Sequence, residues 1–344
     1  MRALIAMSGG VDSSVAALLA TNRGLSCIGA TMHLHDSACA ADAAAVATRL
    51  GIPFHEFDCT QEFKEKIMDK FVHCYETGDT PNPCIDCNRY MKFGRLLDIA
   101  AELDCHYIVT GHYAQITQDP ATGRYLLQKA ADLSKDQSYF LCRLTQHQLA
   151  HTLFPLGDLT KAQARQIAEE NGFINAKKRD SQGICFVPDG DYMAFLERHT
   201  GKQYPTGDFL NCDGQVVGRH RGAVAYTFGQ RKGLGLAMGE PVYVCGKDMQ
   251  KNTVTVGPNE ALFHRNLRAN DWNWISIPEL TGPMTVKAKA RSRMVEQDAI
   301  VYPEENGFAR VEFHEPQRAI TPGQAVVLYD GNTVIGGGNI TESF

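Results

Sequence analysis

Short apolar runs alternate with amphipathic stretches through the first 110 residues of the chain. A short apolar run bounded by turn residues is typical of a buried strand, and apolar residues that recur every three or four positions are typical of a helix. Strands are therefore predicted at residues 3–7, 27–34, 53–57 and 106–110. Helices are predicted between them at residues 11–21, 40–50, 61–75 and 89–103, with a loop at 77–87. Strands that alternate with helices predict a doubly wound α/β fold around a parallel sheet.

The pattern changes near residue 201, where short β-rich runs broken by Gly and Pro begin. Strands are predicted there at residues 223–228, 241–245, 253–256 and 285–290. A chain of 344 residues also exceeds the roughly 250–300 that one hydrophobic core usually serves. We therefore expect three domains: an α/β domain (1–200), a small central β-rich domain (201–261) and a C-terminal domain resembling a β-barrel (262–344).

Charge and composition narrow the class of protein. The chain has 34 Lys and Arg against 39 Asp and Glu, a net charge of −5, which argues against a protein that coats DNA without specificity. No apolar run reaches the roughly 18–20 residues that a membrane span needs, and the opening MRALIAMSGG is too short for the core of a signal peptide. We expect a cytoplasmic protein that does not contact a membrane.

Eleven cysteines are too sparse over this length for a disulfide scaffold, so most should be reduced thiols. Those with no partner motif around them are expected to be small buried hydrophobic residues: Cys27, Cys39, Cys59, Cys74, Cys105, Cys142, Cys212 and Cys245. Cys84, Cys87 and Cys185 differ because their flanks are rich in Pro or Gly and are predicted to be loops. In a reducing compartment, such cysteines are more often catalytic, redox-active or metal-binding than structural.

The strongest motif is SGGVDSS at residues 8–14, between the first predicted strand and helix. Glycines there let backbone N–H groups approach an anion, and the helix N-terminus adds positive potential. Ser13 and Ser14 can donate hydroxyl hydrogens, and Asp12 can hold Mg²⁺ or accept a hydrogen bond within the loop. The alternative is a Ser/Gly turn that only caps a helix. The position directly after a strand favours a phosphate-binding loop.

Several motifs together carry a family resemblance. They are SGGVDSS at 8–14, TPNPxxxCNxxxKF at 80–93, TGHYA at 110–114, KDQSYFL at 135–141, AKKRDSQGICF at 176–186, TFGQRKGLG at 227–235, TPGQ at 321–324 and GGG at 336–338. The first resembles the signature of the PP-loop ATP-pyrophosphatase superfamily, whose fold is similar to that of the adenine nucleotide alpha hydrolases. The whole set, which runs nearly end to end, resembles the tRNA-specific 2-thiouridylase (MnmA) family.

This resemblance implies ATP-dependent thiolation of C2 of the wobble uridine in the tRNAs for Lys, Glu and Gln, with Mg²⁺. It also implies a cysteine desulfurase or sulfur-relay protein as donor; a monomer is the default expectation. By position, Cys185 resembles the family's persulfide carrier and Cys87 the residue that attacks the persulfide, leaving a Cys87–Cys185 disulfide. Asp12 is the third expected catalytic residue.

The resemblance also assigns binding residues. Those expected to bind ATP are Ala6, Met7, Ser8, Gly9, Gly10, Val11, Asp12, Ser13, Ser14, Met32 and Gly111. Those expected to contact tRNA are Asn82, Pro83, Cys84, His112, Lys135, Asp136, Gln137, Arg291, Ser292 and Gln324. The basic cluster Lys177, Lys178 and Arg179 and the Gly-rich turn 229–235 are further candidates for tRNA contact.

One position departs from the usual family pattern, which has Asp where this chain has Cys84. Cys84, Cys87 and Cys185 could hold three irons of a [4Fe–4S] cluster whose fourth iron binds hydrosulfide. The persulfide and cluster routes both stay open from sequence. Another PP-loop ligase, a 4-thiouridine enzyme and a noncatalytic Zn- or RNA-binding protein are the competing functions. The ligases do not need the cysteine pair, and a noncatalytic protein has no use for an intact SGGVDSS.

Overall fold

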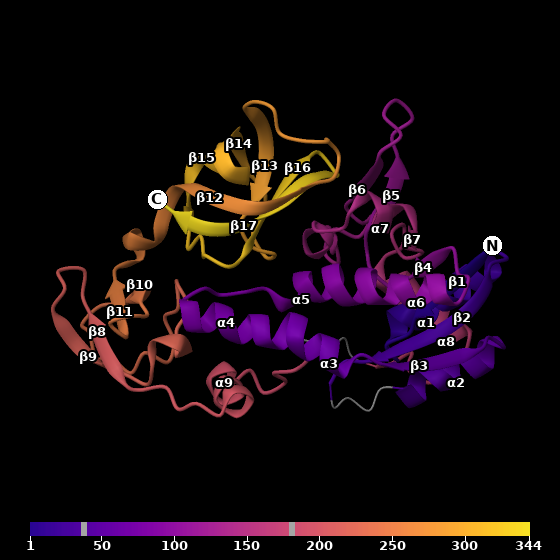
Figure 1. The fold of residues 1–344 in the computed structure, drawn as a ribbon, viewed down its shortest axis with the longest axis horizontal. Helices are drawn as coiled ribbons and strands as arrows, with labels where there is room; N and C mark the ends of the chain where they lie inside the picture. Colours follow the sequence, from indigo (N-terminus) through magenta and orange to yellow (C-terminus); the bar gives the residue numbers. More distant parts are fainter. Residues whose placement is uncertain (36–39, 179–182) are drawn as a thin grey trace.

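The computed structural model describes residues 1–35, 40–178 and 183–344 (Figure 1). Its first part is built on a parallel five-stranded sheet of order β3-β2-β1-β4-β7. The strands are β1 (Arg2–Ala6), β2 (Ser26–His33), β3 (Phe54–Asp58), β4 (Tyr107–Val109) and β7 (Thr152–Leu153). The first four lie where the apolar runs predicted them.

Helices cover both faces of this sheet because successive side chains of β1 point to opposite sides. Ala3 and Ile5 pack in the core under α1, whereas Leu4 packs in the core on the other face. The helices on the α1 side are α1 (Val11–Asn22), α2 (Ala40–Leu50) and α8 (Lys161–Glu170). This alternation confirms the predicted doubly wound α/β fold.

Two long helices, each with a π-helical segment, cover the other face. The first comprises α3 (Thr60–Phe63), η1 (Lys64–Met68) and α4 (Asp69–Thr77). The second comprises α5 (Pro83–Asp86), η2 (Cys87–Arg95) and α6 (Leu96–Glu102). The loop predicted at 77–87 is therefore wrong beyond residue 82. Pro83 is the first helical residue, a position where its missing N–H costs nothing, so proline here begins a helix instead of marking a loop.

The chain continues through η3 (Ser138–Leu141), α7 (Gln146–Ala150) and α9 (Tyr192–Thr200) to a small sheet of order β10-β11-β8-β9. Its strands are β8 (Gly207–Leu210), β9 (Val216–His220), β10 (Tyr243–Asp248) and β11 (Thr253–Gly257). The strand predicted at 223–228 is wrong: the segment starts with the 3₁₀ turn η4 (Ala223–Ala225). Ala223, Ala225 and Tyr226 of this segment pack in the core of the small sheet without pairing as a strand.

A six-stranded barrel follows, with strand order β12-β15-β14-β13-β16-β17 and closure by pairing of β12 with β17. The strands are β12 (Phe263–Trp274), β13 (Met284–Lys289), β14 (Gln297–Pro303), β15 (Ala309–Arg318), β16 (Ala325–Asp330) and β17 (Thr333–Ser343). Two 3₁₀ turns, η5 (Asn259–Leu262) and η6 (Glu305–Gly307), precede β12 and β15. The predicted C-terminal barrel is confirmed.

The barrel rests on the α/β part, above α4 and α5 in Figure 1. A hairpin that the sequence pattern did not predict, β5 (Gln115–Gln118) and β6 (Tyr125–Gln128), extends the barrel sheet through Gln128 opposite Thr333 of β17. The Asn273 amide donates to the carbonyl oxygens of Cys142 and Leu144, 2.9 Å each, across the same boundary. The first and last parts of the chain are therefore held as one unit. No helix in the described ranges has the length and apolar character to cross a membrane.

Candidate active site

The phosphate loop joins β1 to α1 and is held by its own serines. The hydroxyls of Ser13 and Ser14 each donate to the Gly10 carbonyl oxygen at 3.0 Å, and the Ser8 N–H donates to Ser13 Oγ at 3.2 Å. Gly9 has φ +68°, the left-handed region that glycine adopts without strain. Because N–H groups in the first turn of a helix have no intrahelical acceptor, this loop presents donors to an anion.

The side-chain amide of Asn175 supports the phosphate loop through two hydrogen bonds. The Asn175 amide is 3% exposed and donates to Gly9 O at 3.1 Å and to Ser14 Oγ at 2.9 Å. Lys178 Nζ reaches the same Gly9 carbonyl oxygen at 3.3 Å and pairs with Asp42 at 2.7 Å. Lys178 of the predicted basic cluster thus contacts the phosphate loop. Arg179 lies outside the described residues. Sequence reasoning missed Asn175, since nothing in its local pattern indicates a contact 166 residues away.

Gly111 lies against the start of α1. A Cβ atom there would stand 2.6 Å from the Asp12 carbonyl carbon and 2.7 Å from the Ser13 nitrogen, both backbone atoms. Only glycine therefore allows the chain after β4 to pack directly on the phosphate loop. Met32, near the end of β2, is half-buried beside Phe57 of β3. Both residues lie at carboxyl ends of parallel strands, where open α/β sheets bind ligands.

Asp12 is engaged by a cation of the chain itself. Lys161 Nζ lies 2.8 and 2.7 Å from its two carboxylate oxygens, and the Tyr113 hydroxyl donates to one of them at 2.8 Å. Sequence reasoning missed Lys161, which is 149 residues away along the chain. Since Mg²⁺ prefers oxygen ligands, and this one carboxylate is already paired with an ammonium group, the arrangement does not fit a Mg²⁺ site at Asp12.

The three candidate cysteines gather on the other side of the sheet. Cys87 is the first residue of η2 and is buried, while Cys84 in α5 and Cys185 are exposed. The flank of Cys87 is therefore helical, which corrects the predicted loop. Phe186 holds the Cys185 segment by packing edge-on against Phe63 and Phe71, with ring centroids 5.7 and 5.2 Å apart.

Burial and the nearby cation Lys92 affect the pKa of all three thiols. Surrounding protein atoms raise the pKa of all three sulfurs, even the two at the surface, and raise that of Cys87 to about 11. Lys92 lowers the pKa of each thiol, whereas the charges of Cys185 and then of Cys84 contribute to the raised pKa of Cys87. A π-helical turn brings residues five apart onto one face, which aligns Lys92 with Cys87. Lys92 belongs to the KF pair of the 80–93 motif, but sequence reasoning gave it no role.

His112 packs against the helix that carries Cys87, one residue after the glycine that lies against the phosphate loop. Its ring is buried, shares a 2.8 Å hydrogen bond with the Thr110 hydroxyl and packs against Phe93 with centroids 5.5 Å apart. Burial lowers the pKa of His112 well below its ordinary value, and Lys92 lowers it further, so the ring is neutral at pH 7. The segment 110–112 therefore contacts α1 through Gly111 and the cysteine-bearing helix through His112.

A metal cluster at the cysteines does not fit the structure. Within the described ranges no three His, Cys, Asp or Glu side chains converge closely enough to hold a metal ion. The sulfur transfer is therefore assigned to the cysteines without an iron–sulfur cluster.

Comparisons with known proteins agree with this geometry. Family models match three consecutive segments: the tRNA methyl transferase HUP domain (1–189), the tRNA methyl transferase PRC-barrel domain (193–258) and the aminomethyltransferase β-barrel domain (264–340). A protein of Symbiobacterium thermophilum named tRNA-specific 2-thiouridylase MnmA is 48% identical over 99% of this chain and 92% of its own length. Its namesake in Acetivibrio thermocellus is 46% identical over 98% and 99%. The chain belongs to the MnmA family. This confirms the resemblance found in the motifs.

Likeness among solved structures is weaker. A 4-thiouridine synthetase–RNA complex with bound ATP matches at a TM-score of 0.36 and 16% identity, over 58% of this chain and 50% of that chain.

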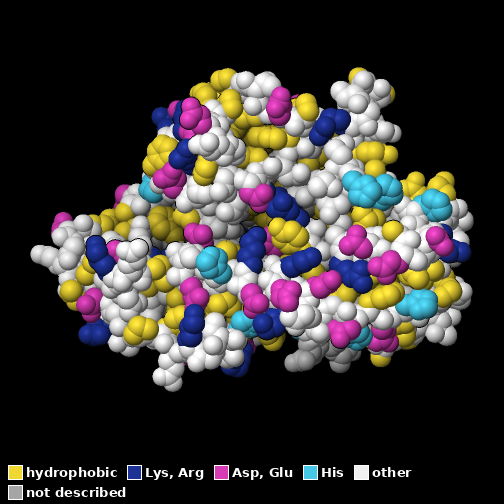
Figure 2. All heavy atoms as spheres, viewed as in Figure 1, with side chains coloured by type: hydrophobic (Ala, Val, Ile, Leu, Met, Phe, Trp, Pro, Cys, Tyr) yellow, Lys and Arg dark blue, Asp and Glu magenta, His cyan; other side chains and the backbone are white. Residues whose placement is uncertain are grey.

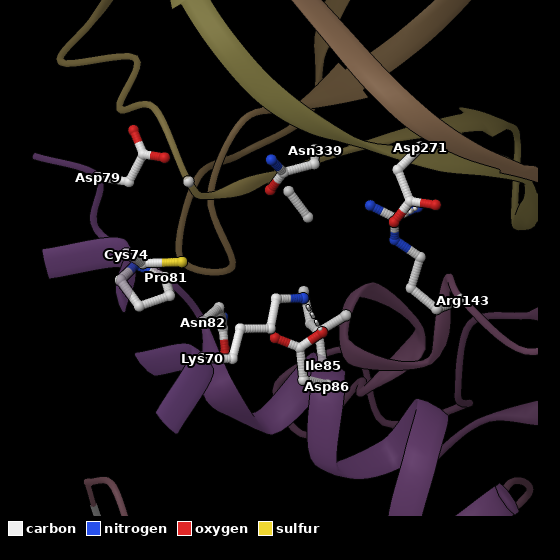
Figure 3. Close-up of a pocket in the computed structure, with 12 residues that line it drawn as sticks. Lys70, Cys74, Asp79, Pro81, Asn82, Ile85, Asp86, Arg143, Asp271 and Asn339 are labelled. Atoms are coloured by element: carbon white, nitrogen blue, oxygen red, sulfur yellow. Dashed lines mark hydrogen bonds and ion pairs between the residues drawn. The ribbon is translucent and has the colours of Figure 1, made fainter. Parts of the chain in front are cut away.

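A cavity of about 100 Å³ lies between the helices of this MnmA-family chain and its barrel. Figure 3 shows Lys70 and Asp86 on the helices below and Asn82 just before α5, with Asn339 and Asp271 on the barrel above. Lys70 pairs with Asp86 at 2.7 Å. The cavity is therefore lined by hydrogen-bonding groups whose charges are partly compensated. Asn82, expected to face the target base, lies in its wall beside the buried Pro83.

Several residues expected to contact tRNA make hydrogen bonds within the chain. Asp136 accepts from the Ala130 and Ser138 N–H groups, and Gln137 accepts from the Tyr113 N–H. The Gln324 amide donates to Thr80 O at 2.6 Å, which ties the barrel to the 80–83 segment. Lys135 and Ser292 are half-buried, and Arg291 is exposed. Their contacts with tRNA stay predictions.

The charge pattern of the visible face is mixed. Figure 2 shows Lys and Arg interspersed with Asp and Glu along the helices. Ion pairs of the second long helix include Arg89 with Asp271 at 2.8 Å and Arg95 with Glu102 at 3.1 Å. This face is therefore not a uniform basic surface for nucleic acid.

Most of the remaining cysteines are buried as expected: Cys27, Cys59, Cys105 and Cys142. Cys74 and Cys245 are half-buried, and the prediction is wrong for Cys212, which is exposed in the turn after β8. Cys39 lies outside the described residues.

Proposed function

We propose that this chain is an ATP-dependent tRNA-uridine 2-sulfurtransferase that replaces the C2 oxygen of a wobble uridine by sulfur. The observation that carries the proposal is the segment 110–112, which contacts the phosphate loop on one side and the cysteine-bearing helix on the other. Oxygen activation and sulfur delivery then take place on either side of one short segment. The 2-thiouridylase names of the relatives support the same reaction.

The first step activates the oxygen. C2 of uracil is a poor electrophile and its oxygen a poor leaving group, so the oxygen attacks the α-phosphorus of ATP and pyrophosphate departs. The backbone N–H donors at 8–14 bind the phosphates. Asn175 and the Asp12–Lys161 ion pair stabilise the conformation of the loop. Because these donors are fixed before ATP binds, they stabilise developing charge without rearranging.

The second step delivers sulfur. Cys185 is exposed, so a donor protein can place a persulfide on it. The Cys87 thiolate attacks the Cys185 sulfur, a Cys87–Cys185 disulfide forms, and hydrosulfide leaves. Hydrosulfide then attacks C2 and AMP departs. A thiol reductant restores both cysteines. Lys92 favours the thiolate of Cys87 against the burial that disfavours it.

Substrate recognition is part of the proposal. The target base must leave the stack of the anticodon loop to be modified, and the cavity that Asn82 lines offers polar groups to it. Shape and splayed loop bases, more than net charge, then select the RNA, which suits a chain of net charge −5. Arg291, Lys135 and Lys177 are the cations proposed to contact tRNA phosphates.

The finer assignments also belong to this proposal: the isoacceptors for Lys, Glu and Gln, Mg²⁺ accompanying ATP, a cysteine desulfurase or relay protein as donor, a cytoplasmic monomer, and domain boundaries near 200 and 261. We favour the persulfide route over a [4Fe–4S] route because the described side chains offer no cluster of metal ligands.

The test is mass spectrometry of nucleosides after incubating the protein with unmodified tRNA, ATP, Mg²⁺, cysteine and a cysteine desulfurase, which supplies persulfide sulfur to Cys185. Wild type should form 2-thiouridine, and Cys185→Ser should release pyrophosphate in a tRNA-dependent manner without forming it. Cys27→Ser, a change at a buried cysteine away from the site, is the matched control and should behave as wild type. Pyrophosphate release that needs a small molecule instead of tRNA would indicate a ligase, and normal 2-thiouridine from Cys185→Ser would end the assignment.

A further inference from the structure

A second pair of thiols lies in the small sheet, apart from Cys87 and Cys185. Cys212 is in the turn between β8 and β9, and Cys245 is in β10. The central strand β11 separates β8 from β10, and its last residue is Gly257. The two cysteines therefore approach β11 from opposite sides.

Gly257 leaves the space in which these thiols meet. A Cβ atom there would stand 2.6 Å from Cys212 Sγ and 3.2 Å from Cys245 Sγ. Both sulfur atoms thus lie against the same side of Gly257, closer to it than a methyl group would allow. Burial, and then the neighbouring Cys212 thiol, raise the pKa of Cys245 to about 11.

A β-bulge in the sheet directs the side chain of Cys245 toward Gly257. Val244 pairs with Val256 and Gly246 with Thr255, so Cys245 is the extra residue of a β-bulge. Bulges redirect side chains and are retained where that direction matters. The hairpin turn that carries Cys212 is ordered as well, because the Asn211 side chain accepts from the N–H groups of Asp213 and Gln215 at 3.0 and 2.9 Å.

We propose that Cys212 and Cys245 form a dithiol–disulfide site that reacts with low-molecular-weight disulfides and fastens the β8–β9 turn to β10. Cys212, which is exposed, attacks one sulfur of the small disulfide and displaces a thiolate. The Cys245 thiolate then attacks the Cys212 sulfur, forms the Cys212–Cys245 bond and displaces the second thiolate. Two electrons pass from the protein dithiol to the small disulfide, which leaves as two thiols.

The bond would close a ring that contains the Gly-rich turn 229–235. Oxidation would therefore restrict the turn that we expect to contact tRNA. The chemistry at this site does not depend on the proposed sulfur transfer, since neither Cys87 nor Cys185 takes part.

The experiment uses the full chain with Cys87→Ser and Cys185→Ser, incubated with glutathione disulfide, digested and mapped by mass spectrometry. We expect a cross-linked peptide pair carrying Cys212 and Cys245, lighter by two hydrogen atoms than the reduced pair and separated by dithiothreitol. With Cys245→Ser added, Cys212 should instead retain glutathione.

Gly257→Ala in the same background is the variant that keeps both thiols. Its methyl group would collide with the sulfur atom of Cys212 and push the two thiols apart, so the yield of cross-linked peptide should fall at least severalfold. Glutathione adducts or free thiols at both positions in the background chain would overturn the proposal, as would full cross-linking in Gly257→Ala.

Discussion

Gly111→Ala is the substitution that most directly tests the contact between residues 110–112 and the phosphate loop. The added Cβ would lie 2.6 Å from a backbone atom of Asp12, whereas ordinary contacts begin at 3.4 Å. The start of α1 or the 110–112 segment must therefore move by roughly 0.8 Å, and overpacking of this kind costs about 1–3 kcal/mol of unfolding free energy. A displacement near 1 Å in a positioning element can lower a rate roughly 100-fold.

The assay is tRNA-dependent pyrophosphate release, with urea unfolding measured in parallel. Gly282→Ala is the matched control, because nothing lies within 4 Å of a Cβ atom at that glycine. We expect a rate about 100-fold below wild type for Gly111→Ala and no change for Gly282→Ala. If Gly111→Ala is folded and releases pyrophosphate at about the wild-type rate, the contact of residues 110–112 with the phosphate loop does not matter for catalysis.

Three further predictions follow from the site. Lys92→Gln should slow iodoacetamide alkylation of Cys87 roughly threefold to tenfold, since the cation that favours the thiolate is gone, whereas the exposed control Lys66→Gln should not. Because burial raises the pKa of Cys87 to about 11 and only the thiolate reacts, its alkylation should accelerate about tenfold per pH unit up to about pH 10; a plateau near pH 8 would contradict this. Asn175→Ala removes buried hydrogen bonds to the phosphate loop and should cost about 1–3 kcal/mol in urea unfolding together with a raised KM for ATP; an unchanged KM would show that the loop does not need this support.

The α/β layer could be predicted because each of its early strands is marked by local apolar pattern. The attachment of the β5–β6 hairpin to the barrel could not, since its partner in β17 lies about 200 residues further along and leaves no local signal. The helix that begins at Pro83 was predicted to be a loop, because proline is favoured both in loops and at the first turn of a helix. The π-helical turn at Cys87 has no known sequence signal comparable to a cap or a breaker.

The candidate site, too, contains residues that could be predicted from sequence and residues that could not. The phosphate loop and the cysteines were found because their residue types are tied to a particular chemistry. Lys161 and Asn175 were missed because an ordinary lysine or asparagine becomes functional only through contacts made by folding. Cys212 was misassigned for a related reason: burial of a cysteine depends on its neighbours in space, and here those are a turn and a bulged strand.

The central claim is that sulfur leaves Cys185 through attack by Cys87. The most direct test is a single turnover without reductant, in which protein loaded with persulfide receives ATP, Mg²⁺ and unmodified tRNA and is then digested for disulfide mapping. The account predicts that 2-thiouridine and a peptide pair cross-linked through Cys87 and Cys185 appear together in equal amounts. Formation of 2-thiouridine while both cysteines are recovered as free thiols would contradict it.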